Sequence, residues 1–158
     1  MKNIGDLSNS YILFELYGTT YAIKSSFVKQ MDMIESITPV PNSHDYVEGI
    51  VFTRGKVIPV INLRKRFGFP DKEIDIKTRL IVLSSNDREI GLIVDSARDF
   101  EVFSEEAIQP VPEVLKTLSD KFLMGYVSLQ NKSILILNTE EILKLSEEPQ
   151  KFLENKEN

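Results

Sequence analysis

The chain has 158 residues, of which 42% are hydrophobic and 27% charged, the balance of an ordinary soluble domain with one core. Its formal net charge of −5 argues against nucleic acid or an anionic membrane as the main partner, because an acidic surface gains nothing from either. The absence of cysteine excludes disulfides, zinc–thiolate sites and cysteine nucleophiles.

Strand signals dominate the chain, because runs of Ile, Val, Leu, Phe and Tyr recur between Gly, Asn, Asp and Ser. In chain order the predicted strands are Tyr11–Tyr17, Thr20–Ile23, parts of 28–37, Val47–Phe52, Lys56–Ile61, Thr78–Ser84, Glu89–Val94, 98–103, Phe122–Leu129 and Ser133–Leu137. Asn62 and Asn138 are expected to cap two short helices, Leu63–Phe67 and Thr139–Leu145. These elements predict a mainly β fold of small barrels with a few short helices.

A single domain is expected over residues 10–146, between flexible polar tails at 1–9 and 147–158. No apolar run approaches the roughly 18 residues of a membrane helix, and the first residues lack the apolar core of a signal peptide. We therefore expect a cytoplasmic protein that does not insert into a membrane.

The chain also repeats itself. Three pairs of segments match: Tyr21–Ile23 with Gly91–Ile93, Ile37–Pro41 with Ile108–Pro112, and Gly49–Asn62 with Gly125–Asn138. The order of these matches favours duplication over chance similarity between apolar hairpins. It predicts two similar β-subdomains with a crevice between them, where a partner could bind.

Candidate catalytic residues are few. His44 is the only histidine, and its polar turn is typical of a solvated surface residue. Asp95 ends an apolar strand, where a carboxylate that accepts backbone N–H bonds is a better explanation than a general base. Because glycine-rich phosphate loops, metal-ligand spacings and nucleophile elbows are also missing, the sequence predicts no enzyme activity, no cofactor and no metal.

The densest basic cluster is Arg64–Arg66. Aromatic platforms for nucleic acid are lacking there, because the neighbouring Phe67 and Phe69 fit core positions after the helix. The cluster is therefore interpreted as a solvated helix face.

The segment Val47–Arg64, followed by Phe67–Gly68, resembles the central motif of the CheW-like domain of bacterial chemotaxis coupling proteins. Further matches are Thr78–Arg79, Gly91–Asp95 and the two Pro-x-Pro segments, and the resemblance runs from about Tyr11 to Leu145. It implies a fold of two similar SH3-like five-stranded β-barrels. It also implies a non-enzymatic adaptor that links the cytoplasmic hairpin tip of a methyl-accepting chemoreceptor to the regulatory domain of a CheA-type histidine kinase, in an array at the membrane.

This sequence departs from the family pattern at three places. Phe52–Thr53 stands where the family has Asn-Leu, Asn62 replaces an aspartate, and Gln30 replaces a glutamate. We expect Arg54, Phe52 and Gln30 to contact partners. A groove between the barrels is expected to accept an amphipathic receptor helix, and its predicted lining is Val28, Met31, Ala97 and Phe100.

The repeat sharpens the expectation for Arg54, because the second hairpin has Gln130 at the matching position. Gly55 and its counterpart Asn131 can both adopt positive φ, so the turn does not need an arginine. Phe52 likewise matches Ser128. These differences favour a partner role, and the alternative is that Arg54 pairs with a local carboxylate.

Three other functions stay open at this point. One is a CheW-like regulatory module of a two-component array outside chemotaxis. Another is a β-barrel that binds a small ligand in its crevice. The third is an SH3-like nucleic-acid barrel, which the acidic charge disfavours.

Overall fold

The computed structural model describes residues 9–113 and 120–147, and this part of the chain contains ten strands, two α-helices and four 3₁₀ helices. The strands are β1 (Ser10–Leu16), β2 (Thr19–Lys24), β3 (Val28–Met33), β4 (Val47–Thr53), β5 (Lys56–Asn62), β6 (Arg79–Ser85), β7 (Arg88–Val94), β8 (Ser96–Val102), β9 (Leu123–Leu129) and β10 (Lys132–Leu137). The helices are α1 (Leu63–Arg66), α2 (Thr139–Leu143), η1 (Ser25–Phe27), η2 (Glu105–Ala107), η4 (Asp120–Phe122) and η5 (Lys144–Glu147). All the predicted strands form, while the predicted tails lie almost wholly outside the described residues.

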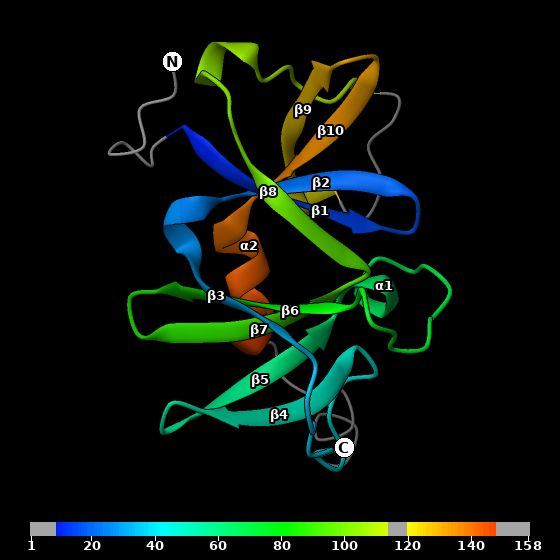
Figure 1. Ribbon diagram of the computed structural model, residues 1–158, viewed down its shortest axis with the longest axis vertical. Coiled ribbons are helices and arrows are strands. Elements are labelled where there is room, and N and C mark those ends of the chain that lie inside the picture. Colours follow the sequence, from blue (N-terminus) through cyan, green and yellow to red (C-terminus); the bar gives the residue numbers. More distant parts are fainter. Residues whose placement is uncertain (1–8, 114–119, 148–158) are drawn as a thin grey trace, which may run out of the picture.

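The strands form two five-stranded sheets with one shared topology. Sheet A has the order β8-β1-β2-β10-β9, and sheet B has the order β3-β6-β7-β5-β4. Figure 1 shows sheet A above sheet B, with α2 between them. The predicted fold class, mainly β with two similar SH3-like five-stranded subdomains, is confirmed.

The two sequence repeats exchange strands. Replacing β1–β5 by β6–β10, and the reverse, converts the order of sheet A into that of sheet B. Sheet A therefore combines β1 and β2 from the first repeat with β8–β10 from the second. Sheet B combines β3–β5 from the first repeat with β6 and β7 from the second. In each sheet, one parallel strand pair joins the two repeats: β2 pairs with β10 in sheet A, and β5 pairs with β7 in sheet B. Each barrel thus contains parts of both repeats, which the sequence comparison did not predict.

Strand pairing also corrects one predicted match between the repeats. Ile136 of β10 lies opposite Ala22, and its counterpart Val60 of β5 lies opposite Gly91. Ala22 therefore corresponds to Gly91 (91 − 22 = 69), whereas the sequence alignment paired Tyr21 with Gly91. The alignment was wrong by one residue, because several buried apolar residues in a row do not fix a register.

The repeated Ile-x-Pro-x-Pro segments lie beside the first strand of each hairpin. Thr38 forms two backbone hydrogen bonds with Ile50, and Gln109 forms the same two with Tyr126. The two segments can approach closely because a glycine, Gly49 or Gly125, precedes the hairpin residue that forms these bonds. A Cβ on Gly49 would stand 2.1 Å from the Thr38 carbonyl oxygen.

Both predicted helix caps are confirmed. The Asn62 side chain accepts a hydrogen bond from the backbone N–H of Lys65, and Asn138 does the same for Glu141. Gly68, with a φ of 80°, follows the end of α1 as predicted. The second helix ends earlier than expected, because the chain tightens into η5 after Leu143.

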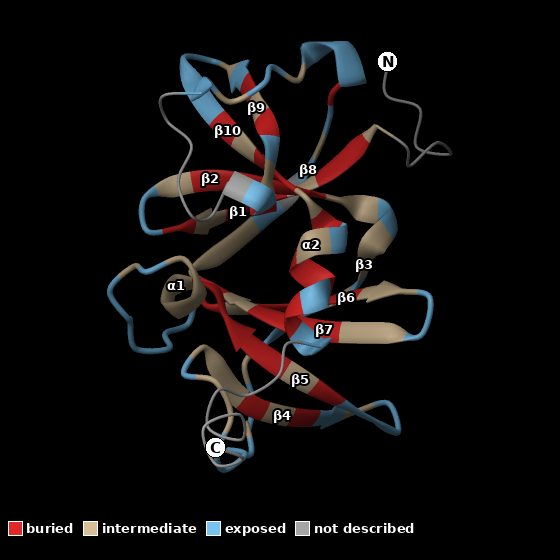
Figure 2. Ribbon diagram, turned by 180° about the vertical axis from the view of Figure 1, so that it is seen from behind, coloured by how far each residue is buried: buried red, intermediate tan, exposed pale blue. Residues whose placement is uncertain are grey.

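The buried residues form three clusters. The largest lies between the sheets and includes Phe14, Ile61, Ile81 and Leu143, and a smaller cluster fills each sheet's own barrel. Figure 2 shows this burial as red segments on the inner strands and on α2. Because the shared cluster joins the sheets, the chain folds around one continuous centre with a barrel at either end.

Candidate functional site

The turn between β4 and β5 places Arg54 at its tip in a left-handed backbone conformation. Arg54 has a φ of 51° and Gly55 a φ of 78°, which suits a two-residue hairpin turn. In the β9–β10 turn, Gln130 has a φ of 50° and Asn131 a φ of 66°. The predicted positive φ of Gly55 and Asn131 is therefore confirmed. The backbone needs no arginine, because Gln130 adopts the same conformation.

An exposed apolar pair lies behind this turn. Phe52 and Val57 are opposite each other across β4 and β5, and they are 75% and 58% exposed. Ser128 and Ser133 form the equivalent exposed pair across β9 and β10. The hairpin fold therefore tolerates polar residues at both positions, and the apolar pair leaves a large hydrophobic area in contact with water.

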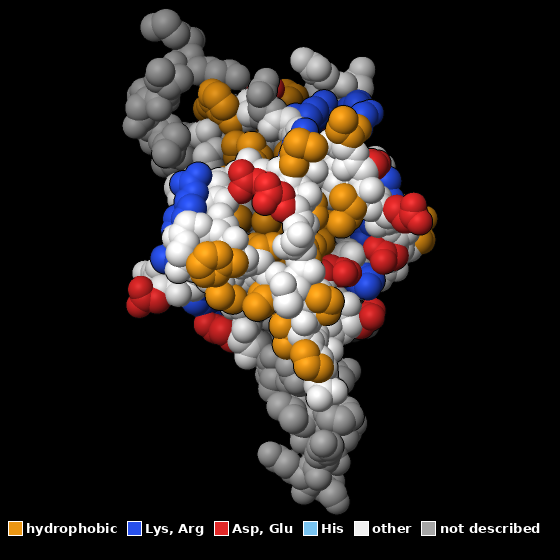
Figure 3. Space-filling view, turned by 60° about the horizontal axis from the view of Figure 1, so that its bottom comes forward, with side chains coloured by type: hydrophobic (Ala, Val, Ile, Leu, Met, Phe, Trp, Pro, Cys, Tyr) orange, Lys and Arg blue, Asp and Glu red, His pale blue; other side chains and the backbone are white. Residues whose placement is uncertain are grey.

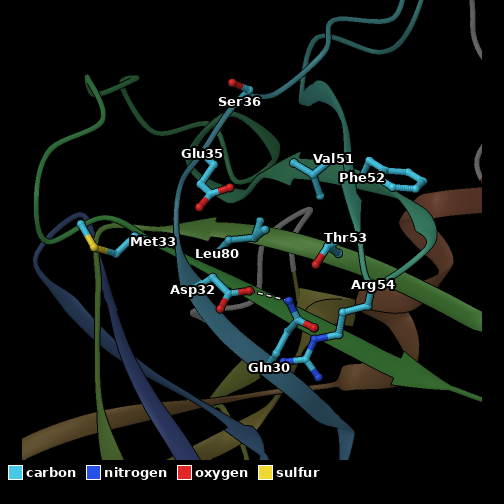
Figure 4. A pocket seen from close by; sticks show the side chains of 10 residues that line it. All are labelled: Gln30, Asp32, Met33, Glu35, Ser36, Val51, Phe52, Thr53, Arg54 and Leu80. Atoms are coloured by element: carbon cyan, nitrogen blue, oxygen red, sulfur yellow. Dashed lines mark hydrogen bonds between the residues drawn. The ribbon is translucent and has the colours of Figure 1, made fainter.

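A pocket of about 320 Å³ brings together three of the predicted partner-binding residues, Gln30, Phe52 and Arg54. It lies between β3 and β4, which are the two edge strands of sheet B, and we call it the seam pocket. Its lining is Gln30, Asp32, Met33, Glu35, Ser36, Val51, Phe52, Thr53, Arg54 and Leu80. Figure 4 shows Arg54 and Gln30 approaching each other at one end of the pocket, while Phe52 points outward.

The repeat shows a size difference beside this seam. Leu80 and Ile34 of the sheet B barrel correspond to Tyr11 and Phe103 of the sheet A barrel, by the same offset of 69 (80 − 11 = 69; 103 − 34 = 69). Tyr11 and Phe103 are buried, with their ring centres 5.0 Å apart. Leu80 and Ile34 are smaller than two aromatic rings, and Leu80 lines the seam pocket while Ile34 packs against the sheet B cluster.

The seam pocket contains an arginine without a partner among the described residues. Arg54 forms no hydrogen bond or ion pair there, although Asp32 and Glu35 line the same pocket. Gln30 uses its amide to donate to Asp32, so that carboxylate is already engaged. No carboxylate in residues 9–113 and 120–147 pairs with Arg54, against the alternative prediction of a local ion pair, so within this part of the chain its guanidinium is open to an acidic group of another molecule.

The other four predicted residues form two equivalent pairs on the edge strands β3 and β8. Val28 lies opposite Leu83 in the neighbouring strand, and Ala97 lies opposite Phe14, which is the repeat counterpart of Leu83. By the same offset of 69, Met31 of β3 corresponds to Phe100 of β8 (100 − 31 = 69). Val28 and Ala97 pack against the shared core, whereas Met31 and Phe100 are 41% and 38% exposed. Both strands run across the near face in Figure 1.

The basic cluster of α1 is not a solvated face, and that interpretation was wrong. Arg64 donates two hydrogen bonds to Asp95, Nε to Oδ1 at 2.8 Å and Nη2 to Oδ2 at 2.6 Å. The Tyr17 N–H also donates to Asp95, at 2.9 Å, which confirms the predicted backbone role of this carboxylate. Burial raises the pKa of Asp95, but these hydrogen bonds outweigh it and hold the pKa below its ordinary value.

The other two cations of α1 are engaged as well. Lys65 lies 3.0 Å from a carboxylate oxygen of Glu48. The Arg66 guanidinium carbon lies 4.7 Å from the centre of the Phe122 ring and 5.6 Å from that of Tyr46. The amphipathic pattern of a four-residue helix could not predict these contacts, since each partner is distant in sequence.

No group of three or more potential metal-ligating side chains lies close together in residues 9–113 and 120–147. His44 stacks on Tyr46, with ring centres 4.9 Å apart. Within the described part of the chain, no helix is long and apolar enough to cross a membrane.

Sequence reasoning missed Val57, Asp32, Met33 and Leu80 at the site. Val57 could have been found, since it matches Ser133 in the repeated hairpin just as Phe52 matches Ser128. The others carry no such signal, because only the folded seam brings β3 beside β4. Figure 3 brings forward the bottom of Figure 1, where β4 and β5 lie, and shows hydrophobic side chains in orange distributed between charged ones.

Two barrels that carry exposed apolar side chains, and an arginine with no ion-pair partner among the described residues, form a module suited to contacting other proteins. The CheW-like domain model matches residues 10–147. The chain is 35% identical over 132 residues to the chemotaxis protein CheW of Bacillus subtilis, covering 84% of this chain and 85% of that protein. It is 34% identical over 136 residues to CheW of Helicobacter pylori, with 85% and 81% covered.

A solved structure agrees with these relatives. The scaffolding protein TtCheW of Thermoanaerobacter tengcongensis superposes with a TM-score of 0.76 at 31% identity, covering 82% of this chain and 88% of that chain. The chain therefore belongs to the CheW-like domain family. It is a non-enzymatic coupling adaptor of chemotaxis signalling.

Proposed function

We propose that this adaptor couples the cytoplasmic hairpin tip of a methyl-accepting chemoreceptor to the regulatory domain of a CheA-type histidine kinase. It would act in the cytoplasm, within an array held at the membrane by its partners. Family membership over residues 10–147 supports this role, since the relatives are named as chemotaxis proteins and one as a scaffolding protein.

The kinase regulatory domain contacts the β4–β5 hairpin and the seam pocket. One observation carries this assignment: the first hairpin has Phe52, Arg54 and Val57 where the second has serine, glutamine and serine. Since both hairpins have the same backbone, the difference is not required by the fold. A partner with an apolar anchor and a carboxylate would complement it, because the carboxylate would meet Arg54, which has no ion-pair partner among the described residues.

The receptor contacts the surface of β3 and β8. Met31 and Phe100 supply exposed apolar side chains on the two edge strands, and Val28 and Ala97 lie beside them against the core. An amphipathic helix laid across both strands would bury its apolar side chains on this surface. We call these four residues the receptor groove.

Signalling passes through differences in binding free energy, because the adaptor carries out no covalent step. A receptor state that alters the groove can change the affinity of the hairpin for the kinase, and the coupling must act equally in the reverse direction. Gln30 belongs to β3 and also lines the seam pocket, so the two surfaces share a strand.

The proposal is tested by capture from native extract followed by identification of the bound proteins. The wild type should retain a CheA-type kinase and a chemoreceptor. A variant that converts the hairpin to the second copy, Phe52→Ser with Arg54→Gln and Val57→Ser, should lose the kinase and keep the receptor. Recovery of neither protein by the wild type would overturn the proposal, and equal kinase recovery by both proteins would overturn the assignment of the hairpin.

A further inference from the structure

Arg64 and Asp95 join the two sheets at one side of the molecule. Arg64 is the second residue of α1, which directly follows β5 of sheet B. Asp95 is the single residue between β7 of sheet B and β8 of sheet A. Their side chains are 13% and 16% exposed, so solvent and salt screen this bidentate pair only weakly.

Asp95 also holds the β1–β2 hairpin of sheet A. Besides accepting from the Tyr17 N–H, it donates its own backbone N–H to the Glu15 carbonyl oxygen at 3.0 Å. Arg64 donates from Nη1 to the Pro70 carbonyl oxygen at 2.8 Å, and its guanidinium carbon lies 5.2 Å from the centre of the Tyr17 ring. Asp95 thus links α1 and the β1–β2 hairpin to the start of β8, through its carboxylate and through its backbone N–H.

A second, more exposed contact between the sheets lies at the start of α2. Glu140 is the second residue of α2 and corresponds to Arg64 (140 − 64 = 76). It accepts a hydrogen bond at 2.7 Å from Arg88, which begins β7 in the other sheet. These side chains are 52% and 23% exposed, so water and salt screen this pair more strongly. Of these two contacts, the Arg64–Asp95 pair is the better shielded from solvent and salt, and we call it the firm contact.

The firm contact lies next to the receptor groove. Ala97 and Phe100 are on β8, which begins one residue after Asp95. Their counterparts Val28 and Met31 are on β3, which belongs to the other sheet. The separation of the two halves of the groove therefore depends on where β8 lies relative to sheet B, and Asp95 is bonded to elements of both sheets.

We propose that Asp95 and Arg64 are positioning residues that hold β8 at the distance from β3 that a receptor helix requires. The inference rests on the proposed receptor groove. It predicts that loss of the Asp95 charge weakens receptor binding selectively, because the β4–β5 hairpin lies outside the contacts that Asp95 makes. A residue needed for stability alone would weaken both interactions together.

The test compares Asp95→Asn with Glu140→Gln, the matched change at the exposed contact. Binding to a soluble receptor hairpin fragment and to the isolated kinase regulatory domain is measured by calorimetry. Asp95→Asn should weaken fragment binding at least about tenfold, equal to 1.4 kcal/mol, and leave kinase binding unchanged. Glu140→Gln should change fragment binding by less than about twofold. Amide hydrogen exchange should accelerate over Ser96–Val102 in Asp95→Asn and stay unchanged over Val28–Met33.

Arg64→Lys serves as a milder second variant, because it keeps the charge but loses the two-pronged geometry. It should weaken fragment binding less than Asp95→Asn, with the same selectivity. Unchanged fragment binding in both variants, or equal losses for receptor and kinase, would overturn the inference. Failure of the wild type to bind the fragment would instead overturn the receptor groove, and exchange over β8 would then decide whether Asp95 holds this strand at all.

Discussion

Lys29 of β3 and Glu89 of β7 form an ion pair across the intervening strand β6, with 2.5 Å between Nζ and Oε1. Lys56, two residues from the hairpin tip, lies 3.6 Å from the other oxygen of the same carboxylate. The hydrogen bond from Lys29 lowers the pKa of Glu89 below its ordinary value of 4.5 and outweighs burial, which raises it. The pair ties the edge strand of the seam pocket to the middle of its sheet.

The protein should lose stability in acid. Glu89 and Asp95 have folded-state pKa values below their ordinary 4.5 and 3.8, so the folded state binds protons less readily than the unfolded chain. Their contribution is complete above the ordinary values and is lost as pH falls through the lowered ones. Urea unfolding at several pH values should show this decline below pH 4.5, and Glu89→Gln or Asp95→Asn should flatten it. An unchanged slope in both variants would contradict the assignment of these carboxylates.

Arg54→Ala should weaken binding of the kinase regulatory domain and leave the melting temperature nearly unchanged. The side chain forms no hydrogen bond or ion pair with the described residues, and alanine at this position would have to adopt the same φ of 51°. Truncation of a true anchor costs about 2 kcal/mol or more in binding. Gln130→Ala at the matching turn is the control and should affect neither quantity. A large fall in melting temperature would show that the arginine is structural.

Phe52→Ser and Val57→Ser should leave folding intact and weaken kinase binding. Both side chains are mostly exposed, so removing them gives up little burial, and the second hairpin folds with serine at both positions. The double variant should also be less prone to self-association, which light scattering can measure. If either substitution lowered the free energy of unfolding as a core truncation does, the pair would belong to the fold.

Gly49→Ala should destabilise the protein severely. Its added Cβ would stand 2.1 Å from the Thr38 carbonyl oxygen, at a φ of 145° that side chains rarely adopt. Overpacking of this kind costs roughly 1–3 kcal/mol, and the backbone strain adds to it. Gly18→Ala is the control, since it has a φ of 79° but no atom within 4 Å of the added Cβ. Chemical denaturation should rank the two, and equal losses would contradict the close approach.

Local signals in the sequence predicted much of this structure. The caps at Asn62 and Asn138 and the positive φ of Gly55 and Asn131 depend on residues close in sequence. Strand positions followed from apolar runs bounded by turn residues. The predicted match between Tyr21 and Gly91 was wrong by one residue, because a run of apolar residues keeps the same pattern when it is shifted by one.

The site was predictable in part for the same reason. Comparison of the repeated hairpins singled out Phe52 and Arg54 without any structure, since equal backbones with different side chains separate fold from function. Asp32 and Leu80 carry no comparable signal. They reach the seam pocket because β3 and β6 lie beside each other, which depends on pairing over long distances in the chain.

The sequence by itself determined a duplicated, mainly β chain, because hairpins, caps and glycine turns follow from short-range interactions, and the resemblance of its Val47–Arg64 motif indicated a CheW-like adaptor. Only the tertiary structure decided that the repeats exchange strands and that Arg64 and Asp95 join the two sheets. Strand exchange depends on which partner buries a shared apolar face best, and an ion pair between residues 31 positions apart depends on that exchange. Both are outcomes of packing over the whole chain, which no local pattern encodes.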